Sequence, residues 1–192
     1  MAKAWQKLVE SAPVRSYRRT AEKKERLLCR YVPREVFEGA ASPEFLFASG
    51  NRNRCNPKGV ACVYFGEGPE TARAEFDSYY REPLTEIGFY GRVSLRAILD
   101  FENEDTRKHF GLGDRDFTRS YVTKLGDLIP LQEIGKAVAS QKRISAIRFP
   151  SHAMRKTGRK GVNLVVFRDA VQDPDFVEIL ERDTVIERWP RS

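Results

Sequence analysis

The sequence predicts an α+β fold, and three observations favour this class. Strand-like and helix-like segments mix along the chain without a regular β-α-β rhythm, which argues against a doubly wound parallel sheet. No G-x-G-x-x-G or G-x-x-x-x-G-K-[ST] loop follows a predicted strand, so the common phosphate-binding loops of nucleotide-binding sheets are absent. The length of 192 residues and the apolar fraction of 41% fit one domain with a substantial core.

The net charge of +7 is concentrated at the N-terminus. Residues 1–34 hold ten basic and three acidic side chains, which is already +7, and leave 24 of each sign for the rest of the chain. Apolar residues at Ala4, Leu8 and Ala12 follow a helical spacing, and a second helical pattern covers 21–28. We therefore expect residues 1–27 to form a basic, mostly helical extension, and residues 28–192 to form a single domain.

The first half of this domain contains two clear elements. Residues 27–47 suggest a strand interrupted by Pro33 and then a loop, and the composition of 50–59 is that of a loop. Residues 60–65 form a short apolar run, as in a strand buried on both faces. The segment 70–82 follows a turn and predicts a helix.

The second half alternates strands and helices. Strands are expected at 91–102, 144–151 and 162–169, and helices at 102–111, 115–128 and 130–141. A basic loop is expected at 152–161, and a last strand or hairpin at 177–189.

Several functional classes are excluded by composition. No apolar stretch is long enough for a membrane span and no secretion signal is present, so we expect a soluble, cytoplasmic protein with no membrane partner. Three cysteines without a C-x-x-C pair and only two histidines predict neither disulfides nor a metal site. His152 follows Ser151, and the two would point to opposite faces unless the strand ends there, so we expect a structural or surface histidine.

Two segments carry residues suited to chemistry. In 54–76 a loop presents Arg54, a buried strand presents Tyr64, and the following helix presents Glu75. In the second segment Ser151 leaves a strand after Pro150, and a basic loop follows. Each residue alone has a structural interpretation: a solvated helix glutamate, a core tyrosine, and a turn or helix-capping serine.

Taken together, the two segments resemble the RES family, small bacterial toxins named for an Arg, a Glu and a Ser. The likeness rests on Arg54 in a Gly/Asn/Pro loop, Tyr64 ten residues later, and Glu75 eleven residues after that within ETARAE. It continues with Pro-Ser at Ser151, the basic loop, and an N-L-V strand that begins at Asn163. The resemblance covers about residues 28–170.

The arginines of the resemblance involve two further positions. Arg30, in CRYVP, resembles an earlier arginine of the family, and Tyr31 lies beside it. Cys55 stands where an aromatic residue is expected after the loop arginine, so Arg52 is the alternative to Arg54. The N-terminal arm lies outside the resemblance and inherits nothing from it.

The resemblance implies an ADP-ribosyltransferase-like fold, with a split antiparallel or mixed β-sheet core and flanking helices, and attack on NAD. Members cleave the bond between nicotinamide and ribose and pass ADP-ribose to water, to phosphate as a co-substrate, or to a protein. Glu75 would then stabilise the oxocarbenium-like transition state, because a carboxylate near the ribose offsets the developing positive charge. NAD is a substrate in this scheme, and no cofactor or metal is implied.

The other implied residues would bind the substrate. Arg30 and Arg54 suit the pyrophosphate, since guanidinium groups bind phosphates through two donors. Tyr64 offers a ring face and a hydroxyl to nicotinamide or its ribose. Ser151 would hydrogen-bond the substrate, Tyr31 would lie in the same site, and Asn163 would fix the basic loop or touch substrate.

A toxin that consumes NAD implies an inhibitory partner. In the family this is a cognate antitoxin with an Xre-like DNA-binding domain that blocks the cleft; a secreted effector with an immunity protein is the other arrangement. Two functions remain as alternatives: mono-ADP-ribosylation of a protein target, and a basic nucleic-acid-binding module. Direct nucleic-acid binding is not expected, because the sequence has no helix-turn-helix, zinc or aromatic-platform motif.

Overall fold

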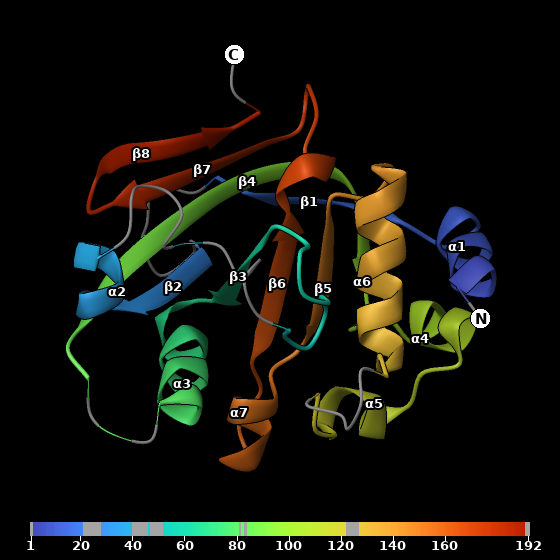
Figure 1. Ribbon diagram of the computed structural model, residues 1–192, viewed down its shortest axis with the longest axis horizontal. Coiled ribbons are helices and arrows are strands. Elements are labelled where there is room, and N and C mark those ends of the chain that lie inside the picture. Colours follow the sequence, from blue (N-terminus) through green and yellow to red (C-terminus); the bar gives the residue numbers. More distant parts are fainter. Residues whose placement is uncertain are drawn as a thin grey trace.

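The computed structural model describes residues 2–20, 28–39, 46, 52–80, 82, 84–121 and 127–190. It confirms the α+β class, with one mixed sheet flanked by helices (Figure 1). The strands are β1 Arg15–Arg19, β2 Leu28–Pro33, β3 Cys62–Glu67, β4 Glu86–Asp100, β5 Ala146–Pro150, β6 Val162–Phe167, β7 Phe176–Glu181 and β8 Thr184–Trp189. The helices are α1 Ala2–Glu10, α2 Arg34–Gly39, α3 Pro69–Tyr79, α4 Glu104–Phe110, α5 Asp114–Thr118, α6 Pro130–Gln141 and α7 His152–Lys156.

The sheet is organised around β4, which has 15 residues and begins before the expected residue 91. The strand order is β2-β3-β6-β5-β4-β7-β8, and β1 also pairs with β4. The first half of β4 pairs with β2 and β7, and its second half pairs with β1 and β5. Since β2 also pairs with β3, the strands β2, β3, β6, β5 and β4 form a closed circuit. The β4–β5 pair is parallel and the other described pairs are antiparallel, so the sheet is mixed.

The sheet separates two hydrophobic cores. On one face α6 buries Leu131, Ile134 and Val138 among side chains such as Phe149 and Phe167. On the other face the alternate strand residues, including Phe65, Phe89 and Leu164, form the second core. The period-two alternation of strands explains this division, because successive residues point to opposite faces.

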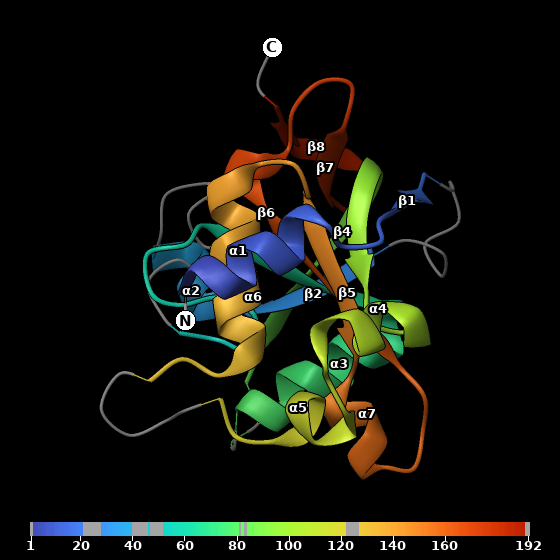
Figure 2. The ribbon, with the colours of Figure 1, turned by 90° about the vertical axis from the view of Figure 1, so that its right-hand side faces the viewer.

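The described part of the N-terminal segment, residues 2–20, packs on the domain and contains a strand as well as a helix. Helix α1 is present and lies against the outer side of α6, where Val9 and Ala12 are buried (Figure 2). Residues 15–19, however, form β1 beside β4, because Pro13 ends the helical pattern and Tyr17 turns into the core between exposed neighbours. Apart from Leu28, the expected helix at 21–28 lies outside the described residues.

Further differences from the expected elements are local. Helix α2 occupies the first part of the loop expected after Pro33. Helix α5 begins at Asp114 and covers only the first four residues of the helix expected at 115–128, of which 122–126 lie outside the described residues. The expected basic loop at 152–161 begins with the short helix α7. The expected C-terminal hairpin is confirmed as β7 and β8. None of the helices in the described part of the chain is long and apolar enough to span a bilayer.

Candidate active site

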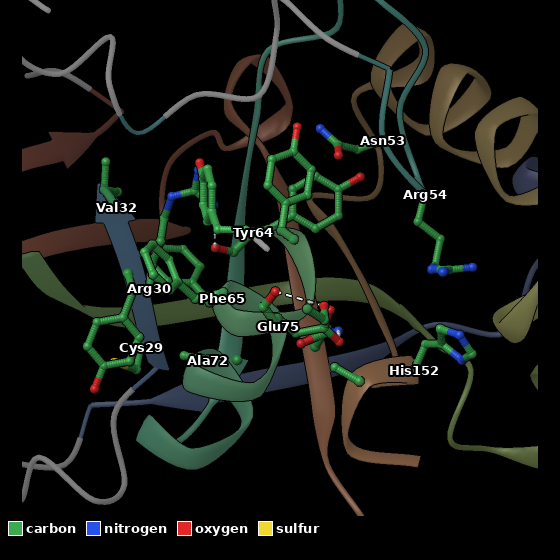
Figure 3. A pocket seen from close by; sticks show the side chains of 18 of the residues that line it. Cys29, Arg30, Val32, Asn53, Arg54, Tyr64, Phe65, Ala72, Glu75 and His152 are labelled. Atoms are coloured by element: carbon green, nitrogen blue, oxygen red, sulfur yellow. Dashed lines mark hydrogen bonds between the residues drawn. The ribbon is translucent and has the colours of Figure 1, made fainter. Parts of the chain in front are cut away.

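A cavity of about 530 Å³ lies between β2, β3, α3, α7 and the loop that carries Arg54 (Figure 3). Its lining includes eight aromatic side chains: Tyr31, Tyr64, Phe65, Phe76, Tyr79, Tyr80, Tyr121 and Phe149. Three cationic side chains also line it: Arg30, Arg54 and Lys156. Among the described residues Glu75 is the only carboxylate of the lining. The cavity therefore combines planar apolar surfaces, positive charge and one acid.

Glu75 faces this cavity because helix α3 starts immediately after β3. Gly66 permits the close turn, since a Cβ there would lie 2.4 Å from the Ala72 nitrogen, and Gly68 takes a φ of 94° before Pro69 begins the helix. The Ser151 hydroxyl donates to Glu75 Oε1 at 2.6 Å and the Asn163 amide donates to the same oxygen at 2.7 Å. No described residue is hydrogen-bonded to Oε2, so this second oxygen is available to a ligand.

Ser151 supports Glu75 from behind. It is fully buried and does not belong to the cavity lining. Its oxygen accepts a hydrogen bond from the Met154 amide at 3.1 Å and so caps α7, while its hydrogen is directed to Glu75. The turn after β5 thus points the hydroxyl at the carboxylate, and the implied contact between Ser151 and substrate stays a prediction.

Asn163 has a related role. It lies on β6 opposite Gly66 of β3 and Phe149 of β5, and it is buried. Its side chain holds Glu75 instead of fixing the basic loop. Asn163 does line the cavity, so contact with substrate stays a prediction.

The Tyr64 hydroxyl is occupied by the loop that carries Arg54. It accepts a hydrogen bond from the Cys55 amide at 2.9 Å and donates one to Asn56 Oδ1 at 2.8 Å. Burial raises the pKa of Tyr64 well above its usual value. The hydroxyl is therefore engaged with the loop while the ring lines the cavity, and its contact with nicotinamide or ribose stays a prediction.

Other contacts hold the same loop. The Gln132 side chain donates to the Asn53 carbonyl at 2.8 Å, and Gly135 lets the Cys55 carbonyl approach helix α6, where a Cβ would lie 1.7 Å away. Burial raises the pKa of the Cys55 thiol, so this cysteine is a packed core residue. The loop is thus held by β3 through Tyr64 and by α6 through Gln132 and Gly135.

Arg54, and not Arg52, lines the cavity. Its Nη1 donates to the Arg119 carbonyl at 3.0 Å, and its guanidinium lies 5.4 Å from the centre of the Tyr121 ring. Arg52 instead donates to the Asp127 carbonyl at 3.0 Å. The structure therefore places the first of the two alternatives at the site.

Arg30 and Tyr31 of β2 also line the cavity. Figure 3 shows Arg30 on the opposite side of Glu75 from Arg54. Arg30 Nη1 donates to the Tyr64 carbonyl at 3.1 Å, whereas its Nε is buried with no hydrogen-bond partner among the described residues. Burial lowers the pKa of Arg30. A buried, incompletely paired guanidinium favours an anionic ligand.

His152 belongs to the site, contrary to the expectation of a structural or surface histidine. Strand β5 ends at Pro150, so the alternation rule no longer separates His152 from Ser151, and the imidazole lines the cavity beside Arg54 (Figure 3). Its pKa is lowered by burial and by the positive charges of Arg54 and Lys156, which favours the neutral form at pH 7. The point at which the strand ends is the signal that would have identified it.

The described residues hold no group of three or more His, Cys, Asp or Glu side chains that could bind a metal ion.

Comparison with known proteins gives a family and a fold. A family model described as the RES domain matches residues 29–187. The fold is similar to that of a chain in the crystal structure of the M. tuberculosis MbcT–MbcA toxin–antitoxin complex, with a TM-score of 0.59 and 16% identity over 87% of this chain and 83% of that chain. No curated protein matches the chain. The expected α+β class, with a mixed sheet core and flanking helices, is confirmed.

Proposed function

The chain belongs to the RES domain family, and on this premise we propose that it is a bacterial toxin that cleaves NAD at the nicotinamide–ribose bond. The observation that carries this proposal is the Glu75 carboxylate, which is held by Ser151 and Asn163 with one oxygen facing a cavity of aromatic and cationic groups.

The lining suits a dinucleotide. Aromatic rings such as Tyr31, Phe76 and Tyr121 offer flat surfaces for the adenine and nicotinamide rings. Arg30 and Arg54 offer donors to a pyrophosphate. A ligand with two planar rings and a negatively charged centre meets complementary groups along the cavity.

Glu75 supplies the catalytic group. When the bond between ribose C1′ and nicotinamide breaks, its electron pair passes to the nicotinamide ring and positive charge develops on the ribose. A carboxylate oxygen fixed beside the ribose stabilises that charge and accepts a hydrogen bond from a ribose hydroxyl. Ser151 is not a nucleophile, because its hydrogen is directed to Glu75 and its oxygen caps α7.

The acceptor completes the reaction. Water, phosphate or a protein side chain attacks C1′, loses its proton to solvent or to a basic group, and yields the ADP-ribosyl product. Water or phosphate would make the protein an NAD glycohydrolase or phosphorylase and would deplete cellular NAD, whereas a protein acceptor would make it a mono-ADP-ribosyltransferase. We further propose that a cognate antitoxin or an immunity protein covers the cavity.

The test is product identification from NAD, with and without phosphate, using folded and inhibitor-free protein. We expect nicotinamide release by the wild type and a loss of at least about 100-fold in Glu75→Gln, the scale seen when a transition-state-stabilising group is removed. Glu70→Gln is the matched control, since Glu70 lies on the same helix, is exposed, and pairs with Arg159. A folded wild type that releases no nicotinamide, or equal rates in the two variants, would reject the proposal.

A further inference from the structure

A cluster of buried charges lies on the face of the sheet opposite the cavity, and the N-terminal arm completes it. Its centre is Arg148, which donates to Glu67 Oε1 at 2.6 Å and to Asp100 Oδ1 at 3.0 Å. Strand β1 adds Tyr17, which donates to Glu67 Oε1 at 2.6 Å, and Arg19, which donates to Glu67 Oε2 at 3.3 Å. We call these five residues, together with Arg15, the arm cluster; Arg15 pairs with Asp100 at 2.8 Å.

The central groups of the arm cluster are shielded from water. The side chains of Glu67, Asp100 and Arg148 are 11%, 3% and 15% exposed. Burial alone would raise the pKa of Glu67, but hydrogen bonds from Arg148 and Tyr17 outweigh it and hold the pKa below its usual value. Removing a partner from such a group leaves a buried charge incompletely compensated, so its position must change.

The arm cluster lies directly behind the two strand ends that lead to the site. Glu67 is the last residue of β3 and lies eight residues before Glu75. Arg148 lies on β5, three residues before Ser151. Glu75 and Ser151, which form a hydrogen bond, thus lie on the segments that follow the two strands joined by the Glu67–Arg148 pair.

The connection from β3 to α3 is stiff. The close approach of Gly66 to Ala72 leaves no room for a Cβ, and the Thr71 hydroxyl donates to the Glu67 carbonyl at 3.5 Å. A displacement of Glu67 would therefore move the start of α3 instead of being absorbed by a flexible turn.

We propose that Tyr17 and Arg19 are positioning residues for the Glu75 carboxylate, which they act on through Glu67. The RES domain match begins at residue 29, so neither residue is part of it. An effect of these residues on the rate of NAD cleavage rests on the proposed function, whereas an effect on the position of α3 does not.

The test compares Tyr17→Phe and Arg19→Gln with Arg18→Gln in the full chain. Arg18 is the matched control because it lies on the same strand, is exposed, and has no described side-chain partner. We expect kcat for NAD to fall about tenfold in the first two variants with little change in KM, since a misplaced catalytic group affects the transition state more than substrate binding. Arg19→Lys, which keeps the charge, should recover part of the loss.

Hydrogen–deuterium exchange, measured well below the unfolding temperature, separates positioning from general stability. In Tyr17→Phe and Arg19→Gln we expect exchange to be faster than in the wild type only at residues 69–75 and 151–157. In Arg18→Gln we expect exchange at wild-type rates. Exchange that matches the control, or that rises across the whole sheet, would overturn the proposal. If the wild type does not cleave NAD, the proposed function fails and the exchange pattern alone decides on the positioning role.

Discussion

Replacing Tyr64 with Phe tests whether this hydroxyl acts on the loop or on the substrate. The substitution keeps the ring in the cavity wall and removes one oxygen, which links the Cys55 amide to Asn56. If the hydroxyl holds the loop, the loss appears in folding stability and in the placement of Arg54.

The magnitude follows from the two hydrogen bonds. Together they contribute about 1–2 kcal/mol net, and leaving the buried Cys55 amide without its partner adds about 1 kcal/mol, so we expect a loss of about 2–3 kcal/mol in the free energy of unfolding. For a chain of this length, this corresponds to a fall of about 5–10 °C in Tm. KM for NAD should rise, because Arg54 is carried by the loosened loop.

The assay is thermal unfolding followed by steady-state kinetics, with Tyr121→Phe as the control. Tyr121 also lines the cavity, and no described hydrogen bond involves its hydroxyl, so its Tm should change little. An unchanged Tm in Tyr64→Phe together with a large fall in kcat would show that the hydroxyl acts on the substrate, and would refute the reasoning.

Three further predictions concern other parts of the molecule. Ser151→Ala removes the α7 cap and one donor to Glu75, so we expect a loss of about 1–3 kcal/mol in chemical denaturation and a lower kcat; unchanged kinetics would contradict the positioning role. Gly135→Ala places a methyl group against the Cys55 carbonyl and should lower Tm, whereas Gly113→Ala, with nothing within 4 Å of its Cβ, should not; equal Tm values would refute the close approach. Because the pKa of Glu67 is held below its usual value in the folded state, its contribution to stability is present above about pH 4.5 and is lost as the pH falls through the folded pKa. In urea unfolding between pH 7 and pH 3, the free energy of unfolding should therefore fall more steeply with decreasing pH in the wild type than in Glu67→Gln. Parallel pH dependences of the two proteins would contradict this prediction.

The elements that local pattern determines were predictable from the sequence. The apolar run of β3, the turn, and helix α3 follow from neighbouring residues, and the spacing of Arg54, Tyr64 and Glu75 placed these three around one cavity. The α+β class and the C-terminal hairpin were equally accessible, since both depend on short-range periodicity.

Features that depend on distant partners were not predictable. Strand β1 forms because Arg15, Tyr17 and Arg19 meet Asp100 and Glu67, and no local pattern specifies those contacts. The true role of Ser151 required knowing that its hydroxyl meets a carboxylate 76 residues away in the sequence. The presence of His152 in the cavity lining follows from the end of β5 at Pro150, one residue earlier than the strand expected at 144–151.

The long strand β4 also has a consequence for biosynthesis. It pairs with β1 and β2 from the first part of the chain, with β5 more than forty residues later, and with β7 close to the C-terminus. Because these contacts are far apart in sequence, the sheet cannot be completed until β7 has been synthesised and has left the ribosome. The Ser151 and Asn163 donors to Glu75 also follow it by 76 and 88 residues, so a nascent chain that ends before Asn163 lacks one of the two hydrogen bonds that hold the carboxylate.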